Sequence, residues 1–382
     1  MSANTNKTLQ GTLSEVSITG FRSLESVNNL KLPRLAVLIG ANGAGKSNLI
    51  RFFEMLSWCL RGRNLQEFVI NHGGGDDQLH FGAKTTPHMS GHLKIDTSAG
   101  INEYRFKLAH VAPDTLAFIE EAFRYSAHSI DGENQWHQLP MPAKESALAD
   151  HAADTAERSH RTAQIIGRLL KSCSTYQFHD TSMKASINMR WDIDEANRLR
   201  SDGGNLAAIL LRLQQEWPKR YRMITRQIAR VLPTFHDFEL ESVAGKVQLR
   251  WRAQGQEKTF GPHLTSDGSL RLFCLFTLLN LPPELLPDIV MIDEPELGLH
   301  PHAIALTGNM IKSMAAQRQV MIATQSPLLV DVFDLDNIIV ARAHEGKTRL
   351  EPMEKSQYKD WLDTDFRISE LWLKEPVDGP YE

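Results

Sequence analysis

Apolar residues follow two patterns along the chain, unbroken runs and strict alternations. The unbroken runs are aliphatic, occupy residues 35–39, 289–292 and 320–323, and each ends in glycine or polar residues. Such runs are typical of strands buried on both faces of a parallel sheet. Residues 91–95 and 104–108 alternate instead, which is typical of antiparallel strands with one solvated face. The chain therefore predicts an α/β protein with two kinds of sheet.

Helical periodicity occupies much of the remaining chain. Apolar positions recur at helical spacing in residues 48–60, 270–281 and 303–317. Residues 115–171 also have a mainly helical and polar pattern. Residues 143–171 contain no sustained heptad, so we expect a compact helical insertion there rather than a coiled coil.

A glycine-rich loop follows the first buried strand. It reads Gly-Ala-Asn-Gly-Ala-Gly-Lys-Ser over residues 40–47, the full phosphate-loop motif between a strand and a helix. The glycines let the backbone turn tightly and direct its N–H groups at phosphate oxygens. Lys46 supplies positive charge for the β- and γ-phosphates, and the Ser47 hydroxyl is placed to bind Mg²⁺. The loop predicts a site for ATP and Mg²⁺.

An acidic pair follows the second buried strand. Asp293 and Glu294 end this strand, and Gln325 follows the next one. Because the carboxyl ends of parallel strands share one edge, we expect these side chains to meet the phosphate loop there. Asp293 is suited to hold Mg²⁺ indirectly or through water, and Glu294 to activate the attacking water as general base. Gln325 can hydrogen-bond phosphate or orient that water.

Composition narrows the class of protein. The formal net charge of the 382 residues is −4, so nucleic acid would have to meet a local basic patch. The scattered Cys59, Cys173 and Cys274 predict neither a disulfide framework nor a metal site, which suits a reducing cytosol. Residues 1–10 lack the apolar core of a signal peptide, and no apolar run approaches a membrane span. We expect a cytoplasmic protein without a membrane partner.

The segment Ser266-Asp267-Gly268-Ser269 begins a long apolar helix just ahead of the acidic pair. A helix N-terminus is a second site for an anion. This order of motifs resembles the ABC ATPase superfamily, in which the phosphate loop of one subunit faces the signature helix of the other. The family signature is Leu-Ser-Gly-Gly, and Thr265 and Asp267 depart from it here. Gln325 stands where ABC transporters have a phosphate-sensing histidine, and no counterpart of the Q-loop glutamine is evident.

Further motifs narrow the resemblance to the RecF/SMC/OLD branch, where OLD means overcoming lysogenization defect. Gly20-Phe21-Arg22-Ser23-Leu24 resembles the opening of RecF- and SMC-type ATPases, in which this edge is part of the nucleotide pocket. Five more motifs resemble the stand-alone bacterial "AAA family" ATPases related to the OLD ATPase domain. They are Phe-His-Asp-Thr-Ser, Asp-Gly-Gly-Asn-Leu-Ala-Ala, Ser-Asp-Gly-Ser-Leu-Arg, Ile-Asp-Glu-Pro-Glu-Leu-Gly-Leu-His-Pro and Ala-Thr-Gln-Ser-Pro.

The resemblance implies an ABC-type P-loop NTPase core, a mixed sheet flanked by helices, with an antiparallel β subdomain and a helical insertion. It divides the chain into a first ATPase lobe (1–112), a helical insertion and second lobe with a β meander (113–260), and a part that completes the core (261–382). It also implies roles for individual residues. Nucleotide binding falls to Asn42, Gly43, Ala44, Gly45, Lys46, Ser47, Asn48, Ser266 and Gly268, catalysis to Glu294, Lys46 and Gln325, and metal binding to Ser47 and Asp293.

Two other features carry open alternatives. His179 and Asp180 could be metal ligands or catalytic groups, but the sequence Asp-Thr-Ser also suits a helix cap or tight turn, which we favour. Arg222, Arg226 and Arg230 recur every four residues on one helix face. Such a stripe is more often a solvated face than a surface for a nucleic-acid backbone.

The resulting hypothesis is an ATPase that forms an ATP-dependent homodimer or a higher oligomer. The resemblance implies a switch or sensor for a separate nuclease or TOPRIM-type effector in antiphage defence. The alternative is a RecF-like ATPase that binds DNA in repair or recombination, which salt-dependent DNA binding would favour. The departures from the ABC transporter pattern at Gln325 and in the signature argue against a transporter subunit. A self-contained nuclease would need a carboxylate cluster outside the ATP site, and the sequence offers none.

Overall fold

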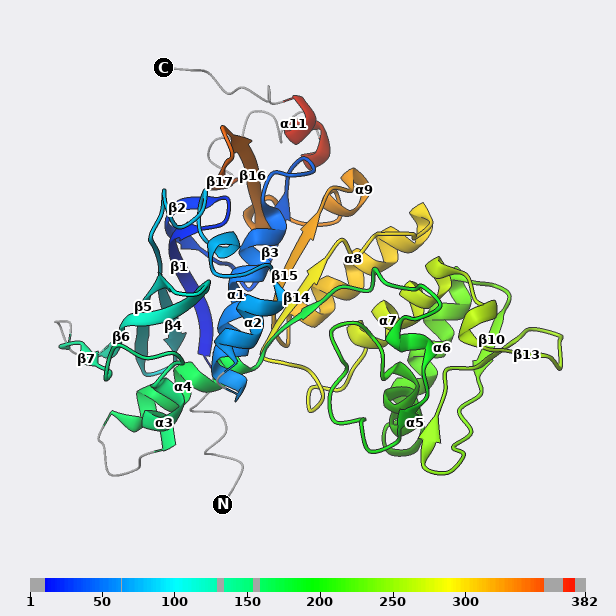
Figure 1. The fold of residues 1–382 in the computed structure, drawn as a ribbon. Coiled ribbons are helices and arrows are strands. Elements are labelled where there is room, and N and C mark those ends of the chain that lie inside the picture. The colour runs from blue at the N-terminus through cyan, green and yellow to red at the C-terminus, as the bar shows by residue number, and fades with distance from the viewer. Residues whose placement is uncertain (1–10, 63, 129–133, 154–158, 354–366, 375–382) are drawn as a thin grey trace. The chain divides into compact units, whose positions relative to one another are not determined.

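The structure is a computed structural model that divides into two compact units (Figure 1). Unit 1 is built from Met1–Cys173, Leu335–Trp361 and Val377–Glu382, and unit 2 from Ser174–Asp334 and Leu362–Pro376. The three-part division of the sequence stays a prediction. The structure describes residues 11–62, 64–128, 134–153, 159–353 and 367–374.

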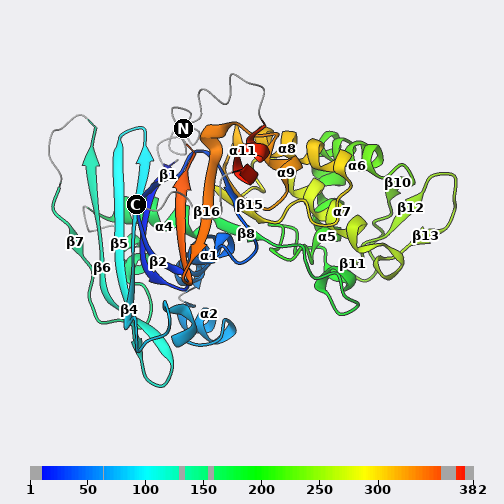
Figure 2. The same ribbon diagram turned by 90° about the horizontal axis from the view of Figure 1, so that it is seen from above.

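Unit 1 contains an antiparallel sheet in the order β2-β1-β4-β5-β6-β7, seen edge to edge in Figure 2. One face of this sheet packs on a helix, because Phe52 of the helix contacts Phe21 of β1 and Phe106 of β5. This confirms the antiparallel strands expected from the alternating segments. The strands are β1 (Gly11–Phe21), β2 (Leu24–Lys31), β4 (His88–Thr97), β5 (Gly100–Val111), β6 (Thr115–Ala127) and β7 (His137–Gln138).

The helical prediction for residues 115–171 is wrong in its first part. Residues 115–127 form β6, which pairs with β5 along its whole length. Alanine and glutamate in this segment favour a helix locally, but the ladder to β5 and the burial of Leu116 and Phe118 decide the outcome. The second part is confirmed by α3 (Leu148–Ala153) and α4 (His160–Lys171).

A second group of strands in unit 1 carries the phosphate loop. All residues of β3 (Leu35–Ile39) are buried, as the apolar run predicts, and α1 (Lys46–Gly62) begins after the loop. Strand β16 (Ile338–His344) runs parallel to β3, and β17 (Lys347–Pro352) returns antiparallel to β16. Strand β17 was not predicted from the sequence. The remaining elements are α2 (Leu65–Asn71) and the short turns η2 (Asp76–Gln78) and η5 (Leu335–Asn337).

Unit 2 contains the strand that carries the acidic pair. Strands β15 (Gln319–Thr324), β14 (Ile289–Asp293) and β8 (Cys173–Tyr176) are neighbours in this order. Strands β14 and β15 are parallel and fully buried, with Asp293 opposite Ala323. Their carboxyl ends therefore share one edge, as the two apolar runs predict.

Helices make up much of the rest of unit 2. The apolar helix α7 is almost wholly buried, which accounts for its near-continuous hydrophobic sequence. No helix among the described residues is long and apolar enough to cross a membrane. In the C-terminal segment, Trp361 lies outside the described residues. Helix α11 (Ile368–Lys374) buries Leu371, and Ser369 of this helix donates hydrogen bonds to Asp331, which follows α9 (Pro327–Val330). The helices are α5 (Leu206–Glu216), α6 (Pro218–Val231), α7 (Asp267–Leu279), α8 (Pro301–Ala315), α9 (Pro327–Val330) and α11 (Ile368–Lys374). The short strands and turns are η3 (Ser186–Asn188), β9 (Trp191–Asp192), β10 (Phe235–Phe238), β11 (Lys246–Val247), β12 (Trp251–Ala253), β13 (Thr259–Phe260) and η4 (Pro262–Leu264).

One buried carboxylate in the antiparallel sheet is held by a histidine and an arginine. Glu103 of β5 accepts a hydrogen bond from Arg124 Nε at 2.7 Å, and its other oxygen lies 2.8 Å from His92 Nε2. Burial by itself raises the pKa of this carboxyl. The hydrogen bonds from His92 and Arg124 and the charge of Arg124 outweigh burial and lower the pKa to about 2.

We predict that Glu103→Gln lowers the free energy of unfolding by up to about 3 kcal/mol at pH 7. Because the folded-state pKa lies below the unfolded value, this stabilisation is present at neutral pH and fades as pH falls from about 4.5 toward about 2. Urea titrations across this pH range should therefore converge for wild type and variant at the acid end. Glu120→Gln, at an exposed carboxylate of the adjacent strand, is the matched control. Equal losses from both variants at pH 7 would contradict the stabilising role of Glu103.

Candidate functional site

The phosphate loop lies between β3 and α1 of unit 1. Gly43 and Gly45 have φ values of +79° and +89°, in the left-handed region that favours glycine. The Ala44 N–H donates to Ala41 O at 3.1 Å, and the Asn48 N–H donates to Gly45 O at 3.0 Å. Lys46 is buried, and its Nζ donates to Gly40 O at 2.8 Å and to Ala41 O at 3.1 Å. Asn42 and Gly43 are exposed, whereas Ser47 is half-buried on the first turn of α1.

A hydrogen-bond cluster supports this loop. Ser23 Oγ lies 2.6 Å from Thr348 Oγ1 and accepts a hydrogen bond from Asn48 Nδ2 at 2.6 Å. Thr348 Oγ1 also donates to Ala44 O at 3.0 Å. A Cβ on Gly45 would overlap both hydroxyls, so the close approach itself requires glycine. The Asn48 carboxamide therefore helps to hold the loop, and its role in binding nucleotide stays a prediction.

The acidic pair lies at the carboxyl end of β14 in unit 2. Asp293 is buried, and its Oδ2 accepts a hydrogen bond from Gln177 Nε2 at 3.0 Å. Among the described residues, its Oδ1 is buried and has no hydrogen-bond partner. Buried carboxylate oxygens almost always have a partner, so this one fits a bound cation or its water. Gln177 directly follows β8, and its contact with Asp293 was not predicted from the sequence.

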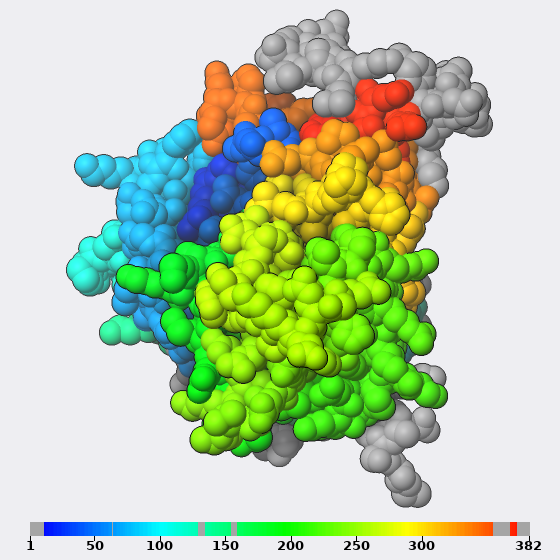
Figure 3. All heavy atoms as spheres, turned by 90° about the vertical axis from the view of Figure 1, so that its right-hand side faces the viewer, coloured from blue at the N-terminus to red at the C-terminus, as the bar shows by residue number. Residues whose placement is uncertain are grey.

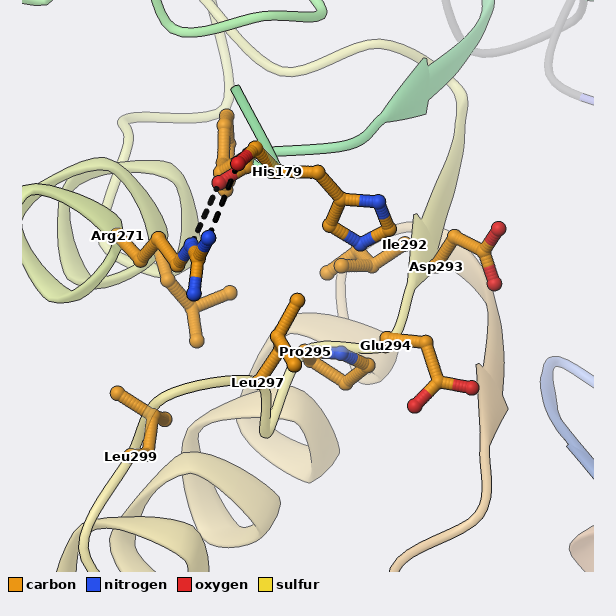
Figure 4. A pocket seen from close by; sticks show the side chains of 10 residues that line it. His179, Arg271, Ile292, Asp293, Glu294, Pro295, Leu297 and Leu299 are labelled. Atoms are coloured by element: carbon orange, nitrogen blue, oxygen red, sulfur yellow. Dashed lines mark hydrogen bonds between the residues drawn. The ribbon is translucent and has the colours of Figure 1, made fainter. Parts of the chain in front are cut away.

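Glu294 adopts an unusual backbone conformation next to this carboxylate. Its φ is +49°, and its N–H donates to Ala323 O at 2.8 Å, which continues the pairing of β14 with β15. A left-handed glutamate is strained, and such strain concentrates at functional sites. In Figure 4 the carboxylates of Asp293 and Glu294 point to the same side of the pocket, away from Arg271. The half-buried Glu294 therefore lies beside the buried Asp293, and its role as a base stays a prediction.

A second carboxylate, Glu296, organises the end of β15. Its Oε1 accepts hydrogen bonds from Thr324 Oγ1 at 2.6 Å and from the Gln325 N–H at 3.2 Å. The side chain of Gln325 is exposed at this strand end. The structure thus brings Asp293, Glu294 and Gln325 to one edge of unit 2. The Glu-Pro-Glu sequence contained Glu296, but nothing in its spacing indicated this contact.

The signature segment begins α7. Ser266 is exposed and caps the helix, because its Oγ accepts a hydrogen bond from the Ser269 N–H at 3.3 Å. Thr265, which departs from the family sequence, is held by Trp251 Nε1 at 2.8 Å. A Cβ on Gly268 would lie 2.8 Å from Gly298 O in the loop after β14. Ser266 therefore lies exposed at the N-terminus of α7, and its role in binding an anion stays a prediction.

His179 and Asp180, each of which could be a metal ligand, a catalytic group or part of a turn, have different surroundings in the structure. Asp180 accepts a hydrogen bond from the Ser182 N–H at 3.0 Å, which confirms the expected tight turn. His179 is exposed and lines the same pocket as Asp293 and Glu294. Among the described residues, no group of three or more His, Cys, Asp or Glu side chains could hold a metal ion. A site with one protein carboxylate suits Mg²⁺, which keeps waters and substrate phosphates as its other ligands.

Solved structures with a similar fold are head domains of Smc proteins. The chain resembles an Smc head bound to the C-winged helix domain of ScpA, with a TM-score of 0.59, 13% identity, and coverage of 90% of this chain and 99% of the other. It also resembles the Pyrococcus furiosus Smc head with an extended coiled coil bound to the C-terminal domain of ScpA, with a TM-score of 0.54, 12% identity, and coverage of 93% and 99%. The fold is therefore that of an ABC-type ATPase of the RecF/SMC branch, as predicted.

A protein-family model also matches most of the chain. Residues 35–331 match the family described as "AAA domain, putative AbiEii toxin, Type IV TA system". The match covers more than half of the chain, and the chain belongs to this family. No curated protein matches it.

Proposed function

We propose that this protein binds ATP between two subunits and hydrolyses it. The observation that carries the proposal is the arrangement around Asp293, with one oxygen held by Gln177, the other buried without a partner in the described residues, and Glu294 beside it. In the proposal, Lys46 neutralises the β- and γ-phosphates, and the loop N–H groups bind their oxygens. Ser47 and Asp293 would hold Mg²⁺, which neutralises developing charge on the phosphates when bound.

In the proposal, the remaining residues either position and deprotonate the attacking water or bind the nucleotide that the other subunit holds. Glu294 would accept the proton of the water, and Gln325 would orient the water or the γ-phosphate through its exposed carboxamide. Ser266 and the N-terminus of α7 would bind the γ-phosphate of nucleotide held by the other subunit. This assignment makes ATP the bridge between two copies of the chain. It is supported by the position of Ser266, which caps α7 and is exposed.

We further propose that the ATP-bound dimer switches a separate effector, a nuclease in antiphage defence. The family description, which names a putative toxin of a toxin–antitoxin system, supports a role beside a partner protein. The Smc heads to which the chain is similar are bound to domains of ScpA, which supports protein partners in general. A switch differs from a motor because its output depends on which nucleotide state persists.

We predict that Glu294→Gln slows ATP hydrolysis by about two to four orders of magnitude, because the amide cannot take the proton. The variant should accumulate as an ATP-bound dimer that requires Mg²⁺, visible as a doubled mass in light scattering. Lys46→Ala should lose both hydrolysis and tight ATP binding and stay monomeric under the same conditions. Opposite effects of the two variants on infected cells would support the switch. Identical loss of protection, with the trapped dimer confirmed, would exclude it and leave the ATPase assignment standing.

A second candidate function is DNA binding, and the surface of α6 favours it. Lys219, Arg222, Arg226 and Arg230 are exposed and line an open groove with Met223 and Gln227. Residues 219–230 contain no acidic side chain, and the opposite face of α6 is buried through Tyr221, Ile224 and Ile228. Figure 3 shows the face on which the green and yellow-green segments of unit 2 lie at the surface. Met223 is the one apolar side chain that lines the groove, which suits a phosphate backbone better than a protein partner.

We predict that replacing Arg222, Arg226 and Arg230 with Gln weakens duplex binding and flattens its salt dependence. Each lost phosphate contact should reduce the slope of log affinity against log salt by about 0.9. The matched control replaces Lys31, Lys84 and Arg349, which are exposed in unit 1, and changes the net charge equally. Fluorescence anisotropy over a range of salt concentrations would measure both. An unchanged slope in the α6 variant, or an equal change in the control, would assign the stripe to a solvated face.

A further inference from the structure

Arg271 lies at the junction of three functional segments of unit 2. It is on the second turn of α7, after the signature residues. Its Nε donates to Phe178 O at 3.2 Å and its Nη2 donates to His179 O at 3.0 Å, the dashed contacts in Figure 4. A guanidinium offers several donors in a rigid plane and can hold two adjacent carbonyls at once.

The segment that Arg271 holds also carries Gln177. Gln177 directly precedes the two bonded carbonyls, and its side chain donates to Asp293 Oδ2 at 3.0 Å. The backbone N–H of Gln177 donates to Ser201 O at 3.0 Å, and this bond holds the backbone at Gln177 itself. A continuous series of contacts therefore leads from α7 through Arg271 and Gln177 to the Asp293 carboxylate.

The loop after β14 packs closely against both Arg271 and the start of α7. Gly298 has a φ of +78°, and a Cβ there would lie 3.2 Å from Arg271 Nη1. Gly268 of the signature approaches the same loop, since its own Cβ would lie 2.8 Å from Gly298 O. Such close packing leaves little room for α7 to move without moving the loop or Arg271.

We propose, on the basis of the proposed function, that Arg271 is a positioning residue that couples the signature helix to the metal-binding carboxylate. It keeps the Phe178–His179 backbone in register with α7, and thereby keeps the Gln177 amide on Asp293. Movement of α7 when nucleotide engages Ser266 then changes how Asp293 is oriented in the same subunit. Partners that orient a metal ligand typically change metal affinity by about 10- to 100-fold when they are removed.

The test measures metal binding without turnover, in the Glu294→Gln background. Mn²⁺ bound in the presence of ATP is followed by electron paramagnetic resonance, and the melting temperature of each variant is recorded. Arg271→Ala and Gln177→Ala should each raise the half-saturating Mn²⁺ concentration by about tenfold or more. The double variant should be no worse than Gln177→Ala alone, because both changes act through one contact. Arg271→Lys should recover only part of the affinity, since an ammonium lacks the planar fork.

Arg318→Ala is the matched control. Arg318 also donates to a backbone carbonyl in unit 2, that of Pro283 at 2.7 Å. It should lower the melting temperature and leave the half-saturating Mn²⁺ concentration unchanged.

Three results would overturn the proposal. They are an unchanged Mn²⁺ affinity in folded Arg271→Ala or Arg271→Lys, fully additive effects in the double variant, and an equal shift in Arg318→Ala. If Arg271→Ala does not fold, Arg271→Lys carries the same test. Absence of any ATP-dependent Mn²⁺ binding in the Glu294→Gln parent would instead refute the proposed function, and this coupling with it.

Discussion

A buried carboxylate without enough partners is the constraint on which this site depends. Asp293 is placed in the interior by β14, whose apolar residues pair in parallel with β15. Burying a carboxylate is costly unless its oxygens are bonded, and Gln177 satisfies only Oδ2. In the proposed site, a cation bound at Oδ1 would complete the bonding of this buried carboxylate, a contribution that a solvated surface carboxylate would offer less strongly. The same apolar strands that build the sheet therefore place Asp293 where the proposal needs a metal ligand.

Hydrogen bonds from side chains hold the phosphate loop of unit 1, as one holds Asp293 in unit 2. Its glycines allow the tight turn, but a flexible loop would have to be ordered each time nucleotide bound. The hydroxyls of Ser23 and Thr348 and the Asn48 carboxamide hold it in advance, with Gly45 packed against both hydroxyls. Such preorganisation lowers the entropic cost of binding. In both units, side chains that do not contact nucleotide or metal in the proposed function fix the position of groups that do.

Much of this architecture could be predicted from local sequence, and the failures have physical causes. Glycine spacing and unbroken apolar runs are local, so the phosphate loop, β14 and the acidic pair were predictable. Strand β6 was missed because its residues favour a helix and only pairing with β5 overrides them. Gln177, Arg271 and Thr348 were missed as site residues because each acts through a contact distant in sequence, which no spacing reveals. Their roles became evident only from hydrogen bonds.

Activity in mixed subunits tests the central claim, a nucleotide site shared between two copies of the chain, most directly. Ser266→Arg blocks the signature and Lys46→Ala blocks the phosphate loop, so neither variant alone should hydrolyse ATP. Mixed in equal amounts, the two variants should form mixed dimers with one intact shared site each. Turnover should return to about a quarter of the wild-type value if subunits pair at random, and to about a half if only mixed dimers form. No recovery in subunits shown to exchange would contradict the shared site. High activity of either variant alone would contradict the assignment of these residues to hydrolysis.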